Sequence, residues 1–195
     1  MNVAPLPRPS DHRSRRRVAI AVSLLLVTNA LASAPAPLTP GMPAPPFSSA
    51  RLDGGKLALG SLRGRVVLLN FWAVGCPPCR IEMPELEKIH RRYSDSGLRV
   101  IGVTEMDPPR DEVARFVAEI GVTYPILLDP GARIGGLYRI EAHPTSVVID
   151  ARGIVRFVNA GYLRGDEKEI ERAVREALAA GVVSPGPRNT DGGKS

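Results

Sequence analysis

The segment VVLLNFWAVGCPPCRIEMPEL, residues 66–86, contains both cysteines of the 195-residue chain. Its first part, residues 66–71, is a continuous apolar run of the kind that forms a buried strand. Pro77 and Pro78 are tolerated in the first turn of a helix, where the backbone N–H groups have no partner. The segment therefore predicts a strand, a turn and a helix, with Cys76 near the N-cap and Cys79 one turn later on the same face.

This placement of the two thiols favours redox chemistry. The positive end of a helix dipole stabilises a thiolate, and C-x-x-C thiols have pKa values of roughly 3.5–7.5 instead of about 8.5. A bridge between them would close a loop too small to stabilise the fold, and a chain of this length can bury a core without one. The alternative is half of a zinc site, which needs four ligands, but beyond the two thiols the chain has only His12, His90 and His143.

Strand and helix patterns alternate along the rest of the chain. The predicted strands are short apolar runs at 66–71, 98–104 and 125–128, followed by a hairpin of 146–150 and 154–159. The predicted helices are 77–93, one that begins at 107–109 and includes 113–120, and one that includes 170–178 and ends at Gly181. This alternation predicts an α/β fold with a mixed central sheet flanked by helices.

The first 34 residues have the features of an export signal. DHRSRRR is a basic segment, VAIAVSLLLV is an apolar run too short to span a bilayer comfortably, and NALASA has small residues at A-x-A spacing. We predict cleavage after Ala32, with an uncleaved N-terminal anchor as the alternative. In both cases the domain is expected in the periplasm or on the extracytoplasmic face of the membrane, with membrane contact only through this segment.

Proline marks the expected limits of the folded domain. Residues 35–46 are rich in proline and predict a stiff, extended linker, and residues 182–195 form a polar tail without a packing pattern. The predicted domain is therefore residues 47–181.

The net charge of +6 belongs mainly to the N-terminal segment. Residues 1–34 contain five arginines and one aspartate, so the remainder of the chain carries only +2. That remainder has no basic block with interleaved aromatic residues, and we predict no binding to nucleic acid.

Several motifs follow one another between residues 42 and 178. They are MPAPPF, LRGRVVLLNFWA, CPPCRIEMPEL, GLRVIGV, FVAEIGVTYPILLD and HPTSVVID, with a glycine at position 161. In order and spacing the chain resembles the TlpA/ResA-like thiol–disulfide oxidoreductases, which are exported or membrane-anchored and have a thioredoxin-like fold. The resemblance implies an extracytoplasmic enzyme that reduces disulfides of cysteine-containing partner proteins, often in cytochrome c maturation. It also implies re-reduction by a membrane thiol carrier and no cofactor other than the Cys76–Cys79 pair.

The resemblance also assigns roles to individual residues. It implies that Cys76 is the exposed nucleophile, that Cys79 is the buried resolving thiol, and that Pro144 is a cis-proline facing the pair. Glu82 matches the acidic residue that couples to protonation of the thiols. The expected contacts with a substrate come from Trp72 at the floor of the site and from Gly75, Pro77, Pro78, His143 and Thr145.

Three residues depart from the family pattern. Asn70 stands where cytoplasmic thioredoxins have a buried acid, so protons must be handled by another group such as Glu82 or water. Gly75 replaces an aromatic residue, which should expose Cys76 more. His143 precedes the cis-proline where an apolar or hydroxyl residue is commoner, and if it faces the thiols it should oppose the effect of Glu82 on the pKa of Cys76.

Two other function classes are compatible with a single C-x-x-C pair. A peroxiredoxin-like peroxidase would need a hydroxyl residue three positions before its reactive cysteine, where this chain has Ala73. A metallochaperone or metal-binding module would use both thiols as ligands, with His143 as a third, but the chain lacks a methionine or histidine cluster. Both alternatives are weaker than thiol–disulfide exchange.

Overall fold

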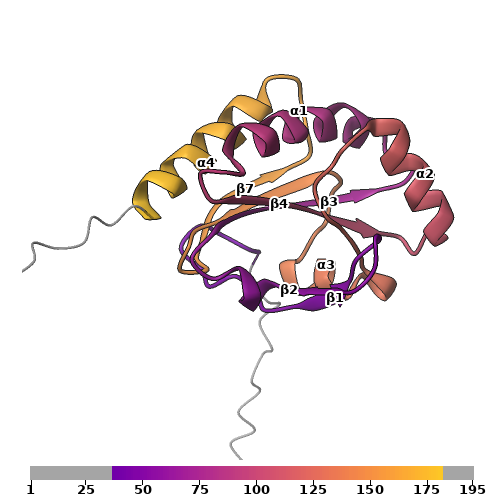
Figure 1. Cartoon of the computed structure of the whole chain (residues 1–195), viewed down its shortest axis with the longest axis horizontal. Coiled ribbons are helices and arrows are strands. Elements are labelled where there is room, and N and C mark those ends of the chain that lie inside the picture. Colours follow the sequence, from indigo (N-terminus) through magenta and orange to yellow (C-terminus); the bar gives the residue numbers. More distant parts are fainter. Residues whose placement is uncertain (1–36, 182–195) are drawn as a thin grey trace, which may run out of the picture. The chain divides into compact units, whose positions relative to one another are not determined.

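The computed structural model describes residues 37–181 of the chain (Figure 1). The predicted export signal and the predicted polar tail lie outside these described residues. Between residues 37 and 181, no helix combines the length and the apolar character needed to cross a membrane.

A five-stranded mixed sheet forms the centre of the fold. Its strands are β3 (Val66–Ala73), β4 (Leu98–Glu105), β5 (Ile126–Leu128), β6 (Thr145–Ile149) and β7 (Val155–Ala160), in the order β5-β4-β3-β6-β7. Strands β3, β4 and β5 are parallel, and β6 and β7 are added through antiparallel pairings. The predicted α/β fold with a mixed central sheet is confirmed.

Strand β3 lies in the middle of this sheet and is buried along its whole length. Successive side chains point to opposite faces, so Leu68 and Trp72 join one hydrophobic cluster whereas Leu69 and Phe71 join the other. A strand covered on both faces has no solvent side, which explains its continuous apolar run. Asn70 is its only polar residue, and its side chain has a specific partner described below.

Three helices cover one face of the sheet, drawn above it in Figure 1. They are α1 (Pro77–Tyr93), α2 (Arg110–Ile120) and α4 (Asp166–Gly181), and each coincides with a predicted helix. Each presents apolar residues at helical spacing to the sheet, as Ile170, Ala173, Val174 and Ala177 do in α4. These helices and the sheet form the larger of the two hydrophobic clusters.

The opposite face of the sheet is covered by elements that the sequence patterns did not predict. They are the hairpin of β1 (Ser48–Ala50) and β2 (Lys56–Ala58), two 3-10 segments (Leu59–Leu62 and Pro130–Ala132) and the short helix α3 (Arg133–Tyr138). Tyr138 anchors α3, because its ring packs on Phe47 and Phe71 and its hydroxyl donates to the Pro45 carbonyl at 3.0 Å. This second layer gives the sheet a core on both faces.

Residues 41–46 pack against the domain, although the sequence analysis places them in the linker. The Gly41 N–H donates to the Val155 carbonyl at 2.8 Å, and the Ala44 N–H donates to the Gly153 carbonyl at 2.9 Å. Ala44 is also part of the second hydrophobic cluster. The folded unit therefore begins before the predicted boundary at residue 47.

Candidate functional site

The two cysteines lie where β3 leads into α1. Cys76 is the N-cap residue of α1, and a disulfide joins it to Cys79 with a Cα–Cα distance of 5.3 Å. Cys79 is 0% exposed, whereas Cys76 is half-buried at the surface. The Cys79 backbone N–H donates to the Cys76 Sγ at 3.3 Å. After reduction of the disulfide, this donor and the N-terminal end of the helix both favour a thiolate at Cys76.

The turn before Cys76 depends on a glycine. Gly75 has a φ of +80°, a left-handed conformation that residues with a side chain rarely adopt. Gly75 and Pro77 are exposed and Pro78 is half-buried, so these residues form an open rim around the Cys76 sulfur. The rim lies where the sequence analysis expects contact with a partner protein.

A second loop, immediately before β6, reaches the same edge of the sheet. The peptide bond between His143 and Pro144 is cis, as the family resemblance implies. Strand β6 runs antiparallel to β3 with Thr145 opposite Phe71, so this loop lies beside the end of β3 that leads to Cys76. The Thr145 side chain is buried, and its hydroxyl donates to a carbonyl of the loop at 2.7 Å. Thr145 therefore holds the loop, while His143 and the backbone before Pro144 stand closer to solvent.

A buried carboxyl group lies one turn of α1 beyond the disulfide. Glu82 is 0% exposed, and it follows Cys79 by three residues, which places both on the same side of the helix. Asn70 of β3 donates to its Oε2 at 2.6 Å, and the Ser146 hydroxyl of β6 donates to its Oε1 at 3.0 Å. Asn70 and Ser146 are directly paired across the sheet and also contact each other at 3.2 Å. The two strands thus supply a prepared pair of donors for one carboxyl group.

Burial raises the pKa of Glu82 to about 7 from its ordinary value of 4.5. The hydrogen bonds from Ser146 and Asn70 act in the opposite direction, and the nearby Asp166 carboxylate adds a smaller rise. A carboxyl group with a pKa near 7 exchanges its proton easily at neutral pH. Glu82 can therefore take up or release the proton that the cytoplasmic thioredoxins handle with a carboxyl group at the Asn70 position.

Trp72 packs in the hydrophobic core below the disulfide and does not reach the surface. It was expected among the substrate contacts, but its side chain is fully buried. The indole stacks on the Phe116 ring of α2, with 5.0 Å between ring centroids and 15° between planes. Such stacking fixes the end of β3 rather than offering a surface to a partner.

His143 is paired with a carboxylate that the sequence analysis did not single out. Its Nε2 contacts the Oε2 of Glu105, the last residue of β4, which is 4% exposed. Glu105 lies beside Ala73 in the parallel pairing of β3 and β4, and its carboxylate fills the space in front of Gly135 of α3. The His143–Glu105 pair is thus on the α3 face of the sheet, whereas Glu82 is on the α1 face.

The space in front of Gly135 provides a direct test of this arrangement. A Cβ at Gly135 would lie 1.4 Å from the Glu105 Oε1, whereas a Cβ at the neighbouring Gly136 would meet no atom within 4 Å. We expect Gly135→Ala to displace Glu105 from His143 and to lower the free energy of unfolding by roughly 1–3 kcal/mol, as overpacking does. Gly136→Ala is the matched control and should be neutral or slightly stabilising.

Urea unfolding of both variants measures this difference. Adding Glu105→Ala to Gly135→Ala removes the clash and should restore part of the lost stability. Equal unfolding midpoints for Gly135→Ala and Gly136→Ala would contradict the arrangement, because they would show that the Glu105 carboxylate does not occupy the space in front of Gly135.

Two polar residues of the site, Ser146 and Glu105, were missed because each lies far in sequence from its partner. The separation is 64 residues between Ser146 and Glu82 and 38 residues between His143 and Glu105. The available signal was a polar residue within or at the end of an otherwise apolar strand, as in SVVI and VIGVTE. Such a residue in a buried strand needs a hydrogen-bond partner.

Comparison with known proteins identifies the family. The sequence pattern of the AhpC/TSA family matches residues 40–158, which include the disulfide, Glu82 and the cis-proline loop. The chain belongs to the AhpC/TSA family. The chain is 37% identical over 131 residues to the thioredoxin-like protein YneN of Bacillus subtilis, covering 66% of this chain and 76% of that protein.

Further relatives of this AhpC/TSA family member are named for thiol–disulfide exchange. It is 37% identical over 110 residues to the thiol-disulfide oxidoreductase ResA of Halalkalibacterium halodurans, covering 56% of this chain and 62% of that protein. Among solved structures, it resembles a thioredoxin-family thiol:disulfide interchange protein of Chlorobium tepidum at 30% identity and a TM-score of 0.63, covering 73% and 99% of the two chains. It also resembles a secreted thiol-disulfide isomerase of Corynebacterium glutamicum at 25% identity and a TM-score of 0.63, covering 70% and 85%.

These relatives confirm the predicted ResA-like family and the thioredoxin-like fold. The chain is a thiol–disulfide oxidoreductase of this family, with the Cys76–Cys79 disulfide at the start of α1. Among residues 37–181 there is no group of three or more His, Cys, Asp or Glu side chains that could hold a metal ion. The relatives' names favour thiol–disulfide exchange over the peroxidase alternative.

Proposed function

We propose that this oxidoreductase works outside the cytoplasm and reduces disulfides in cysteine-containing partner proteins. The observation that carries the proposal is the asymmetry of the two sulfurs. Cys76 is accessible at the start of α1 and has a backbone N–H directed at its sulfur, whereas Cys79 is completely buried. Only the Cys76 sulfur can therefore come into contact with a disulfide of a partner protein.

The reaction consists of two exchange steps. The Cys76 thiolate attacks one sulfur of the partner disulfide, which forms a mixed disulfide and releases the other sulfur as a thiolate. Cys79 then loses its proton and attacks the Cys76 sulfur, which releases the second partner thiolate and closes the Cys76–Cys79 disulfide. Two electrons pass to the partner, and its two thiolates take up two protons. Glu82, three residues from Cys79 and with a pKa of about 7, is placed to accept the Cys79 proton.

The cis-proline loop and the rim around Cys76 are the proposed contact surface for the partner. Gly75, Pro77 and His143 are at least partly exposed there, and the backbone before Pro144 lies at the same edge of the sheet. An extended segment of a partner that pairs with this backbone would bring its disulfide to Cys76. An apocytochrome c, whose cysteines must be reduced before haem attachment, is the partner that the family resemblance favours.

The proposed location rests on the N-terminal sequence and on the secreted relative. Residues 1–34 have the features of an export signal, and the Corynebacterium glutamicum protein is described as secreted. Outside the cytoplasm a reductant has no glutathione or thioredoxin pool to restore it. A membrane thiol carrier is therefore the proposed source of electrons for the Cys76–Cys79 disulfide.

One labelling experiment tests location and direction together. Intact cells that produce the protein are treated with a membrane-impermeant maleimide, which adds a fixed mass to each accessible free thiol. We expect most molecules to be labelled at Cys76 without prior reduction, because an extracytoplasmic reductase is kept in its dithiol form. Cys76→Ser is the control for labelling of the buried Cys79.

The other outcomes contradict separate parts of the proposal. Labelling that requires cell lysis would place the domain in the cytoplasm. Labelling that requires prior treatment with a reductant would show that the protein is kept oxidised and acts as an oxidant.

A further inference from the structure

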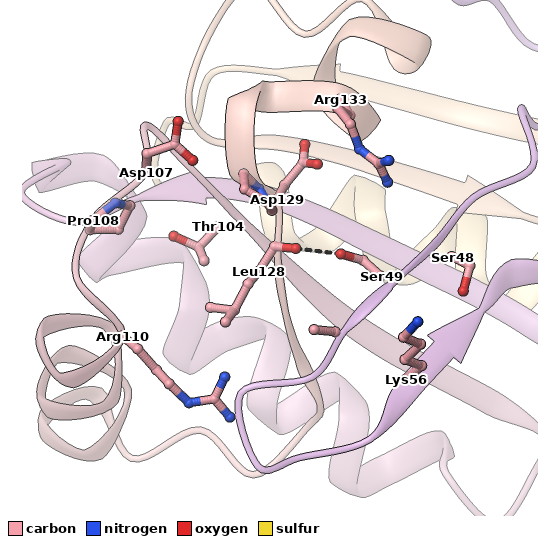
Figure 2. A pocket seen from close by; sticks show the side chains of 12 residues that line it. Ser48, Ser49, Lys56, Thr104, Asp107, Pro108, Arg110, Leu128, Asp129 and Arg133 are labelled. Atoms are coloured by element: carbon pink, nitrogen blue, oxygen red, sulfur yellow. Dashed lines mark hydrogen bonds between the residues drawn. The ribbon is translucent and has the colours of Figure 1, made fainter.

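A pocket of about 660 Å³ lies beside the end of β5, apart from the disulfide (Figure 2). Four segments surround it: the hairpin at 48–50 and Lys56, the end of β4 with the loop at 107–110, the turn at 128–130, and Arg133. Its volume falls within the range of roughly 300–1,000 Å³ that is usual for small-molecule sites. None of the residues of the proposed exchange reaction lines it.

Hydrogen bonds between the segments tie the walls of the pocket together. The Ser49 hydroxyl donates to the Leu128 carbonyl, a contact drawn as a dashed line in Figure 2. The Leu52 N–H donates to the Ile126 carbonyl at 2.8 Å, which fixes the hairpin along the edge of β5. Arg110 donates to the carbonyls of Arg51 and Leu52, which fixes the start of α2 to the same hairpin. A ligand would thus meet a preformed site and would not have to order these segments.

The acidic groups of the pocket are already occupied by backbone donors. The Asp129 carboxylate, 2% exposed, accepts from the Ile134 and Gly135 N–H groups at 2.9 Å. The Asp107 carboxylate accepts from the Gly131 N–H at 2.9 and 3.0 Å. These bonds satisfy the carboxylates and hold the turn at 128–130 in place.

Of the three basic side chains of the pocket, Arg110 is bonded to the hairpin, whereas Lys56 and Arg133 retain free hydrogen-bond donors. Within residues 37–181, neither Lys56 nor Arg133 forms an ion pair or a side-chain hydrogen bond, and Figure 2 shows their charged ends pointing toward each other across the pocket. Thr104 is buried in the wall, and its hydroxyl also lacks a partner among these residues. These unpaired donors favour a ligand that carries hydrogen-bond acceptors. Because Lys56 and Arg133 are both positively charged, they favour a ligand with a negative charge.

Apolar surface makes up much of the remaining wall, contributed by Ala50, Pro108, Leu128 and Pro130. We propose that this pocket binds a small organic anion, with a carboxylate or phosphate held between Lys56 and Arg133 and an apolar body against these side chains. The guanidinium of Arg133 suits both groups, because its paired N–H donors match two oxygens of either. The proposal is independent of the direction of thiol–disulfide exchange.

The test uses the oxidised full-length protein and three probes of similar size: phenyl phosphate, benzoate and uncharged benzyl alcohol. Amide chemical shifts in ¹⁵N spectra are followed during titration. We expect saturable shifts with phenyl phosphate or benzoate, centred on residues 48–50, 104 and 128–133. Benzyl alcohol should bind at least tenfold more weakly, because it lacks the charge that the two cations recognise.

Two double variants, each of which loses two positive charges, distinguish binding at this pocket from general attraction of anions to a basic protein. Lys56→Gln with Arg133→Gln should weaken binding of the anionic probe at least tenfold. Arg164→Gln with Lys168→Gln removes the same charge from exposed positions at and near α4 and should leave binding within about twofold. Urea unfolding midpoints show that both double variants are folded.

Three results would overturn the proposal. They are shifts that do not saturate, equal weakening in both double variants, and benzyl alcohol binding as tightly as the anions.

Discussion

Cys79→Ser is expected to accumulate mixed disulfides with partner proteins, whereas Cys76→Ser should trap very few. In Cys79→Ser the half-buried Cys76 at the surface can still attack a partner disulfide, but no second thiol remains to release the product. In Cys76→Ser the remaining sulfur is completely buried and cannot reach a partner. Exchange activity should fall to background in both variants, because each lacks one of the two steps.

The trapping is measured on non-reducing gels after acid quenching of cells that produce each variant. The double variant Cys76→Ser/Cys79→Ser provides the blank, since the chain has no other cysteine. Adducts that disappear on reduction and occur only with Cys79→Ser would support the assignment, and their mass identifies the partner. Equal trapping by the two single variants would contradict the assigned order of attack.

Glu82→Gln is expected to flatten the pH dependence of stability between about pH 5 and pH 7. In the folded, oxidised protein burial raises the pKa of Glu82 to about 7, compared with 4.5 for a solvated glutamate in the unfolded chain. Between these values the folded state binds more protons than the unfolded state, so stability falls as pH rises. The contribution is fully present below pH 4.5 and is lost as pH rises through 7.

The size of this effect follows from the difference between the two pKa values, about 7 and 4.5. At about 1.4 kcal/mol per pH unit, the wild type should lose roughly 3 kcal/mol of unfolding free energy across this range. Glutamine cannot titrate, so this part of the slope should vanish in Glu82→Gln. The introduced glutamine side chain would still be able to accept a hydrogen bond from Asn70 or Ser146 through its carbonyl oxygen.

Urea unfolding at half-unit steps from about pH 4.5 to about pH 8 gives the two slopes. Glu85→Gln is the matched control, since Glu85 lies on the same helix but is ion-paired with Lys88 at the surface. It should keep the wild-type slope. A slope unchanged by Glu82→Gln would mean that the buried carboxyl group does not take up a proton in this range.

The central sheet and the three long helices were predictable because their sequences carry strong local patterns. Strand β3 is a continuous apolar run, and α4 repeats apolar residues at helical spacing. Strands β1 and β2 have three residues each and no such run, so they are defined only by pairing with each other and by contacts at the edge of β5. Helix α3 has the sequence RIGGLY, in which two glycines oppose helix formation. Its N–H groups are held by Asp129, a tertiary contact that no local pattern shows.

In the candidate site, too, the local motif was predictable from the sequence and the contacts between distant segments were not. The cysteine pair is a local motif, so its position at the start of a helix follows from the two prolines after Cys76. The partners of Glu82 and His143 come from other strands, and they become neighbours only through the strand order β4-β3-β6. Glu82 and His143 are therefore recognisable in the sequence, whereas their partners are not. Side chains alternate between the two faces along each strand, which places Asn70, the partner of Glu82, on the α1 face and Glu105, the partner of His143, on the α3 face.

The complete burial of β3 has a consequence for how this protein can diversify. Its side chains belong to both hydrophobic clusters, and its end delivers Cys76, so a change in the strand disturbs stability and the reactive thiol together. Pro77 and the loop at 142–143 lie outside both clusters, at the edge of the sheet that carries the same thiol. New partner preferences can therefore arise by substitution in these loops at small cost to folding, while the strand beneath them is retained.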